Sequence, residues 1–181
     1  MLKASGGRLD FFDIVNFDFK DFSKFGFSKV FVAGKDVFFY KGGERRDAKS
    51  PSIFLSSDAK EMIKNLKFFD FFYLQSYDTN LELATKLKKR KKFFLVSIGD
   101  ILFSKGIEKA NKIAKMSKFV KFCNFYDVDF ILATLANDFY GVRTPREIER
   151  IGEIIGLTRQ QARFSISLEK VGDIFEKYSQ R

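Results

Sequence analysis

Histidine and tryptophan are absent from this sequence of 181 residues, which contains one cysteine and two prolines. Without histidine the chain lacks the commonest metal ligand and the commonest general base. A single cysteine can form neither an internal disulfide nor a thiolate zinc cluster. These absences argue against metal-dependent hydrolysis and against a Cys–His nucleophile. We therefore expect no catalytic residue and no metal-binding residue in this chain.

The side chains that remain for such chemistry are one thiol and a few acids. Cys123 lies in an apolar helical stretch, so we interpret it as a buried, reduced thiol. Asp127, Asp129 and Asp138 surround one predicted strand, and paired carboxylates can hold magnesium. A hard cation prefers several oxygen ligands, and no further ones stand nearby in the sequence. We therefore interpret the three acids as capping and loop residues.

Long apolar runs are absent as well. No stretch reaches the length of a membrane span, and the N-terminus shows no hydrophobic signal region. The single cysteine suits a reducing compartment. Together these features predict a cytoplasmic protein without a membrane partner.

The residues that are present favour a folded, basic domain. Hydrophobic residues make up 45% of the chain, and 33 Lys and Arg against 23 acids give a net charge of +10. The length and composition predict a single domain over residues 1–181. The charge favours a polyanionic partner, either nucleic acid or an anionic membrane surface. We expect most of the 25 phenylalanines to lie in the core, because they follow the apolar stripes and strands.

Short apolar runs alternate with amphipathic stretches through most of the chain, which is typical of parallel strands joined by helices. The N-terminal part differs, because residues 29–33 and 36–40 flank Gly34 and favour a hairpin with a two-residue turn. The predicted strands are 52–56, 71–75, 93–97 and 128–133. The predicted helices are 58–66, 78–90, 107–125, 145–155 and 169–178.

The helix that begins at Pro145 is the best specified of these. Thr144 can act as its N-cap, Pro145 suits the first helical position, and Glu147 completes a capping box. Gly156 is expected to end it. Its predicted apolar face consists of Ile148, Ile151, Ile154 and Ile155.

Arginines accompany this helix in an unfavourable place. Arg143 and Arg146 stand beside a helix N-terminus, where the helix dipole disfavours cations. The loop before the helix follows the carboxyl end of a strand, the edge that carries function in α/β folds. The alternative is a set of surface ion pairs with Glu147, Glu149 and Glu153. The predicted RNA-binding arginines are Arg143, Arg146, Arg150 and Arg163.

A second basic group lies at the end of the predicted helix 78–90. Cations are favoured at helix C-termini, which is one explanation. Six nearly consecutive cations also repel one another, and a phosphate backbone would relieve that repulsion. The predicted RNA-binding residues of this group are Lys86, Lys88, Lys89, Arg90, Lys91 and Lys92.

Three motifs near the C-terminus occur together in one known family. They are Arg143-Thr144-Pro145-Arg146-Glu147, the segment from Gly152 to Leu157, and the segment from Ala162 to Ser167. In their order and spacing they resemble archaeal ribonuclease P protein component 3, a relative of the thirty-kilodalton protein subunit of eukaryotic ribonuclease P. The resemblance is clearest over residues 93–170, and the N-terminal third is shortened and divergent.

The resemblance implies a TIM-barrel-like α/β fold. A complete barrel takes about 250 residues and rarely fewer than about 200, so we expect a shortened or distorted barrel of parallel strands with an irregular N-terminal hairpin. In that family, the arginine at the position of Arg143 is implicated in RNA contact.

The resemblance also implies a function in tRNA processing in archaea. The chain would be a protein subunit of ribonuclease P, the endonuclease that removes the 5′ leader from precursor tRNA. The RNA subunit performs the hydrolysis and uses the magnesium, so the protein needs no cofactor. The implied partners are ribonuclease P RNA, protein component 2 in a two-plus-two assembly, and indirectly the precursor tRNA. The alternatives are a free-standing basic RNA-binding protein and, disfavoured by the missing histidine, a metal-dependent phosphoesterase.

Overall fold

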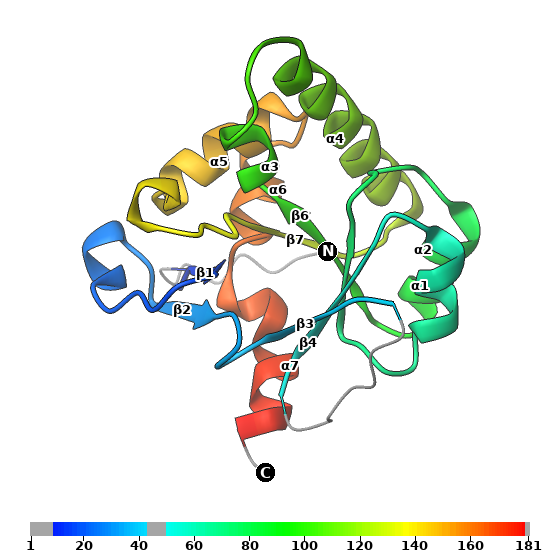
Figure 1. Cartoon of the computed structure of the whole chain (residues 1–181), viewed down its shortest axis with the longest axis horizontal. Coiled ribbons are helices and arrows are strands. Elements are labelled where there is room, and N and C mark those ends of the chain that lie inside the picture. The colour runs from blue at the N-terminus through cyan, green and yellow to red at the C-terminus, as the bar shows by residue number, and fades with distance from the viewer. Residues whose placement is uncertain (1–8, 43–49, 180–181) are drawn as a thin grey trace.

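A computed structural model describes residues 9–42 and 50–179 (Figure 1). The strands are β1 (Phe12–Val15), β2 (Lys29–Val32), β3 (Phe38–Tyr40), β4 (Ser52–Ser56), β5 (Phe71–Leu74), β6 (Phe93–Ser97) and β7 (Phe130–Ala133). The α-helices are α1 (Ala59–Asn65), α2 (Leu81–Lys89), α3 (Gly99–Leu102), α4 (Gly106–Tyr126), α5 (Pro145–Ile154), α6 (Arg159–Phe164) and α7 (Leu168–Ser179). Two short 3-10 helices, η1 (Phe22–Phe25) and η2 (Phe139–Gly141), complete the list.

All paired strands run parallel, which confirms the predicted α/β class. One sheet has the order β3-β4-β5-β6-β7 and the other consists of β1 and β2. Beyond the carboxyl end of β7, the chain joins the two sheets: Asn16 N donates to Ala136 O at 2.7 Å and Leu135 N donates to Ile14 O at 3.0 Å. Towards the other end, Ser165 O accepts from Leu132 N and Ile166 O accepts from Phe12 N. At this end of the strands, the segment 165–166 therefore lies between β7 and β1 and bonds to both, as a strand in that position would.

The predicted hairpin over residues 29–40 is wrong. Gly34 does turn the chain with a φ of +80°, but β2 pairs with β1 and β3 pairs with β4. The ring of Phe175 from α7 stacks on Phe31 of β2 with centroids 3.6 Å apart and also approaches Phe71 of β5. The described strands thus form an interrupted arrangement with a break between β2 and β3, and α7 packs beside that break.

Phenylalanines dominate the core, as predicted. The largest fully buried side chains include Phe12, Phe31, Phe54, Phe69, Phe71, Phe72, Phe94 and Phe119. Cys123 is also completely buried, as expected for a structural thiol. Burying each such ring stabilises the fold by about 2–3 kcal/mol, so the aromatic content is explained by packing.

The start and end of α5 are as predicted. Thr144 and Glu147 form the capping box, and Gly156 follows the helix with a φ of +96°. Gly152 packs so closely on α6 that an added Cβ would lie 2.6 Å from the Cβ of Ala162. The two helices can approach this closely because residue 152 has no side chain.

The predicted apolar face of α5 needs one correction. Ile148 and Ile155 are completely buried, whereas Ile154 is 62% exposed. Positions 148, 152 and 155 follow one another at spacings of four and three, so they share the helix face that packs inward. Ile154 lies about 120° around the helix from residue 148 at about 100° per residue, which places it in solvent.

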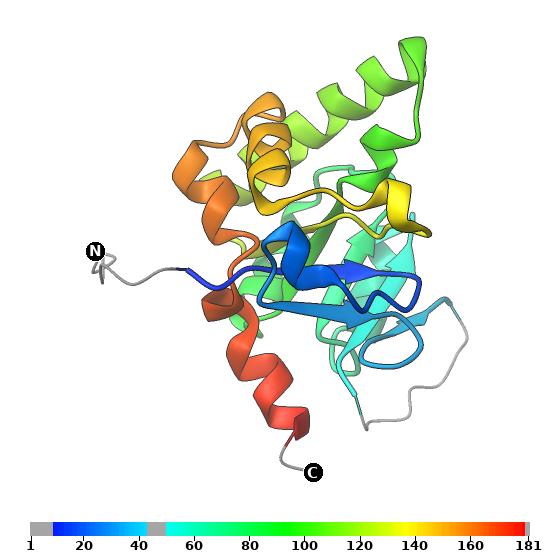
Figure 2. The same cartoon turned by 90° about the vertical axis from the view of Figure 1, so that its left-hand side faces the viewer.

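Helices α7 and α4 extend from opposite ends of the strands (Figure 2). Lys170 and Tyr178 of α7 contact Asp129 and Asp70, which precede β7 and β5, so α7 covers the amino ends of the strands. Helix α4 has its buried residues from Met116 onwards. Within the described residues, no helix combines the length and apolar character needed to cross a bilayer.

Candidate nucleic-acid interface

The loop between β7 and α5 holds Arg143 against its own backbone. Nη1 of Arg143 donates to the carbonyl oxygens of Tyr140 and Val142, each at 2.7 Å. Two aromatic residues of η2 are exposed close by in the sequence, Phe139 by 54% and Tyr140 by 86%. The guanidinium is therefore fixed in position on the surface by the loop, and its remaining donors are left for a ligand.

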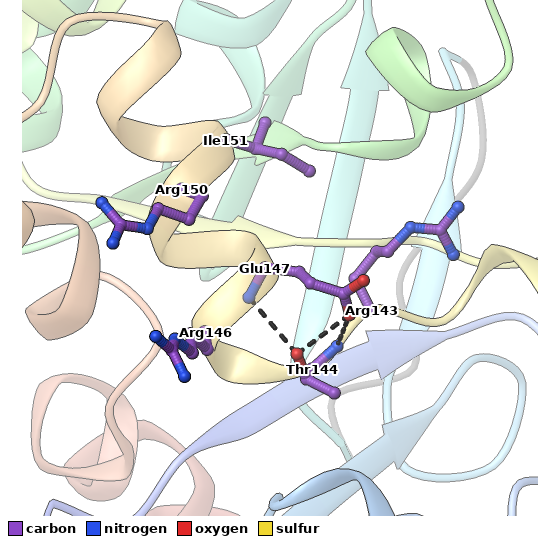
Figure 3. Close-up of a pocket in the computed structure, with 6 residues that line it drawn as sticks. All are labelled: Arg143, Thr144, Arg146, Glu147, Arg150 and Ile151. Carbon is purple, nitrogen blue, oxygen red and sulfur yellow. Dashed lines mark hydrogen bonds between the residues drawn. The ribbon is translucent and has the colours of Figure 1, made fainter.

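An open pocket of about 390 Å³ surrounds the first turn of α5 (Figure 3). The carboxylate of Glu147, which lines the pocket, already accepts two hydrogen bonds. Its Oε2 accepts from Thr144 N at 2.8 Å and from Thr144 Oγ1 at 2.9 Å. Arg146 and Arg150 reach away from the helix on one side, and Arg143 lies on the other. The lining residues are Arg143, Thr144, Arg146, Glu147, Arg150 and Ile151.

The other arginines of this region have acidic partners. Arg150 pairs with Glu153 at 2.7 Å in an exposed ion pair. The buried Glu149 forms ion pairs with two arginines: its Oε2 lies 3.4 Å from Arg159 Nε, and its Oε1 lies 3.7 Å from Arg163 Nε. Arg163 also lies over the ring of Phe11, and its Nε is buried without a hydrogen bond. These contacts give Arg163 a packing role, and its contact with RNA stays a prediction.

The basic run 86–92 is divided among several neighbours. Lys86 pairs with Glu82 at 2.7 Å, and Lys88 pairs with Asp127 at 3.1 Å. Lys92 is mostly buried and pairs with Asp70 at 3.2 Å. The three remaining side chains are exposed, and within residues 9–42 and 50–179 none forms an ion pair; they are Lys89, Arg90 and Lys91.

The two predicted RNA-binding groups are not brought together. The run 86–92 ends directly before β6, at the amino ends of the strands, whereas Arg143 follows the carboxyl end of β7. Figure 1 shows α2 and α5 on opposite sides of the molecule.

The three aspartates near β7 serve the chain itself, as interpreted from the sequence. Asp138 accepts from Gly141 N at 3.0 Å and caps η2. Asp127 ends α4 with a φ of +54° and pairs with Lys88, and Asp129 pairs with Lys170. Among the residues that the structure describes, no three metal-ligating acids or thiols gather in one place.

Sequence reasoning missed a polar cluster at the carboxyl ends of the strands. Asp13 of β1 is fully buried and accepts from Thr134 N at 2.7 Å, from Thr134 Oγ1 at 2.6 Å and from Ile14 N at 2.8 Å. Burial raises the pKa of Asp13 to about 7 despite these hydrogen bonds. The available signal was an acid inside the apolar run from Phe11 to Val15.

A second missed group centres on Asp100. Its Oδ2 accepts from the hydroxyl of Tyr73 at 2.6 Å and from that of Tyr77 at 2.8 Å. Burial, followed by the charge of Asp100, raises the pKa of both phenols above their usual range. This edge is where barrel enzymes place catalytic groups. Here the hydroxyls of Tyr73 and Tyr77 and the carboxylate of Asp13 are paired inside the protein.

No protein-family model matches the sequence. A chain in the structure of archaeal ribonuclease P with mature tRNA superposes with a TM-score of 0.63 at 11% identity, covering 93% of this chain and 91% of that chain. An A. niger ochratoxinase gives a TM-score of 0.54 at 12% identity, covering 78% of this chain and 40% of the other. A Xaa-Pro dipeptidase with bound methionine gives 0.52 at 15% identity, covering 81% and 45%.

These comparisons establish the α/β fold. The likeness to the ribonuclease P chain extends over nearly the full length of both chains. The chain spans less than half the length of the ochratoxinase and of the dipeptidase.

Proposed function

We propose that this chain is a protein subunit of an archaeal-type ribonuclease P, of the component 3 kind. It would bind the catalytic RNA and assist removal of the 5′ leader from precursor tRNA. The observation that carries the proposal is the near-complete fold match to a chain of archaeal ribonuclease P. The two hydrolases match the same fold over less than half of their length.

The three sequence motifs support the same proposal, because each has a defined place in the fold. The first forms the capped start of α5 with its arginine pocket. The second contains Gly152, which allows α5 and α6 to pack closely, and Gly156, which ends the helix. The third contains Ser165 and Ile166, whose carbonyls bond to β7 and to the start of β1. The second and third motifs thus hold in place the helix and strands on which the arginines of the first motif are exposed.

The proposed mechanism is electrostatic. Guanidinium groups bind phosphate oxygens in a planar, two-pronged geometry, and Arg143 is already held in place by two carbonyls. Neutralising phosphates would stabilise the active RNA fold and lower the magnesium that the RNA needs. The RNA performs the hydrolysis and uses the magnesium, while the protein pairs with component 2 in a two-plus-two assembly in the cytoplasm.

Reconstitution tests this proposal. Cognate ribonuclease P RNA and component 2 are assayed for precursor-tRNA cleavage at low magnesium, with and without this chain. We expect cleavage to require the chain and the double variant R143A/R146A to reduce it about 10-fold, as for the loss of two phosphate contacts. The matched control is K115A/K118A on the exposed side of α4, which also removes two charges. Cleavage that is indifferent to the chain, with all partners folded, would contradict the proposal.

The second candidate is a free-standing RNA-binding protein. It is favoured by the net charge alone and differs from the first candidate in its partners. Purification of the tagged chain with RNA but without ribonuclease P RNA or component 2 would support it. A phosphoesterase is disfavoured by the absence of histidine, and a phosphatase assay with added divalent metals tests that alternative.

A further inference from the structure

A groove between α1 and α2 is lined by more cations than the basic run alone supplies. Its volume is about 340 Å³, which exceeds the roughly 30 Å³ share of a water molecule about tenfold. Ile63 and Leu66 provide its apolar residues. The cations come from both helix ends and are Lys64, Lys67, Lys86, Lys89 and Arg90.

Few acids compensate this charge. Glu82 pairs with Lys86, but within the described parts of the chain Lys64, Lys67, Lys89 and Arg90 form no ion pair. Helices α1 and α2 both end beside the groove, and each end carries about half a negative charge. The dipoles and Glu82 together offset about two of the five positive charges. About three positive charges remain without compensation, so the helix dipoles alone do not account for this cluster of cations.

We infer that the groove between α1 and α2 is a second binding site for an RNA phosphate backbone, separate from the arginine pocket of α5. The identity of the RNA rests on the proposed function. A concave groove with donors on both walls suits a linear polyanion, because a flat anionic membrane contacts protruding residues. Lys64 and Lys67 thereby join the interface, although they lie outside the basic run.

The position of the groove implies that two separate RNA segments are bound. The groove lies at the amino ends of the strands and the arginine pocket lies beyond their carboxyl ends. Strand β6 has five residues and spans about 13 Å at about 3.3 Å per step, and the groove lies at the opposite end of the sheet from Arg143. The protein would therefore clamp two parts of a folded RNA.

Salt-dependent binding tests the groove. The triple variant K64A/K67A/K89A is compared with K115A/K118A/K121A, which removes the same charge from exposed positions on α4. Binding is measured with cognate ribonuclease P RNA and with an unrelated structured RNA of equal length. We expect the groove variant to weaken binding about 10- to 100-fold and to reduce the salt slope by about 2–3, since each lost phosphate contact lowers it by about 0.7–0.9. Circular dichroism checks that both variants are folded.

The outcomes separate this inference from the proposed function. A groove variant that binds ribonuclease P RNA like its control overturns the groove and leaves the proposed function standing. Equal, groove-dependent binding to both RNAs supports the groove and counts against the proposed function. Groove-dependent binding to phosphatidylglycerol vesicles, with RNA binding unchanged, assigns the groove to a membrane surface and overturns the inference.

Directed hydroxyl-radical probing tests the clamp. The only native thiol, Cys123, is fully buried, so an iron chelate can be attached to one introduced cysteine. We expect Lys64→Cys and Arg150→Cys to cleave different RNA segments, and Lys115→Cys to cleave weakly. Cleavage of one common segment from positions 64 and 150, or none from position 64, would contradict two-site binding.

Discussion

The arginine pocket of α5 and the lysine groove of α1 and α2 present positive charge in different ways. In the pocket, Arg143 is held by two carbonyls, and the helix beneath is packed through Ile148 and Gly152. In the groove, Lys64 and Lys89 project from the exposed ends of two helices. A conspicuous position in the sequence therefore does not show whether a cation is free to bind a ligand. Two arginines of the conspicuous motif region are shared with Glu149, whereas lysines from two separate segments are unpaired among the described residues.

The comparison predicts different responses to mutation. Substitutions beneath the pocket should change the free energy of unfolding, because α5 is part of the core. Substitutions in the groove should change RNA binding with little effect on stability.

The free energy of unfolding should be most sensitive to substitution at Ile148. Ile148→Ala should lower the free energy of unfolding by about 2–5 kcal/mol, because the side chain is completely buried and its removal leaves a cavity. Ile154→Ala on the same helix should change it by less than about 0.5 kcal/mol, because that side chain is 62% exposed. Urea unfolding measures both. Equal losses would show that the two faces of α5 have been assigned wrongly.

Asp13 should make the free energy of unfolding of the protein depend on pH. In the unfolded chain Asp13 loses its proton near pH 3.8, whereas in the folded protein it keeps the proton until about pH 7. Between these values the folded state binds more protons, so the free energy of unfolding falls as the pH rises, by an amount on the order of 4 kcal/mol.

Asp13→Asn should remove this fall, which urea unfolding at several pH values between 4 and 8 measures. Asp78→Asn, which changes an exposed carboxylate, is the control and should keep the fall. A wild-type profile that rises over this range would contradict burial as the dominant influence on Asp13.

Gly152 should be the next most sensitive position. Gly152→Ala should cost about 1–3 kcal/mol, because the added Cβ would lie 2.6 Å from that of Ala162 and force α5 and α6 apart. Gly172 in α7 is a matched control, because an added Cβ there meets nothing within 4 Å. Gly172→Ala should raise the free energy of unfolding by about 0.5–1 kcal/mol. Thermal unfolding of the two variants should therefore shift in opposite directions.

Two neighbours in the basic run should differ modestly in their effect on RNA binding. Lys88 pairs with Asp127, whereas Lys89 lines the groove. In RNA binding at 0.1 M salt, Lys89→Ala should weaken affinity about 3- to 10-fold and Lys88→Ala less than about 2-fold. Lys88→Ala should lower stability by less than about 1 kcal/mol, as is usual for an exposed ion pair. A larger binding loss at Lys88 would argue that the whole run, and not the groove, contacts RNA.

Local features of the structure were predictable where neighbouring residues determine them. The capping box of Thr144 and Glu147, the glycine end at Gly156 and the short strand 52–56 all depend on residues a few positions apart. Predictions were wrong where distant segments compete. Residues 29–32 form a strand as expected, but β1 provides a better partner than β3, and no local pattern encodes that preference.

For the candidate site, the residue types, the absence of histidine, the net charge and the arginines around a well-capped helix follow from the amino-acid order alone. Which cations are neutralised depends on the fold, because Glu149, Asp70 and Asp127 reach their partners through packing. The fold also brings Lys64 and Lys67 into one groove with Lys89 and Arg90, because only the packing of α1 against α2 places these positions together. Charge composition is a property of the chain, whereas charge density is a property of the folded surface.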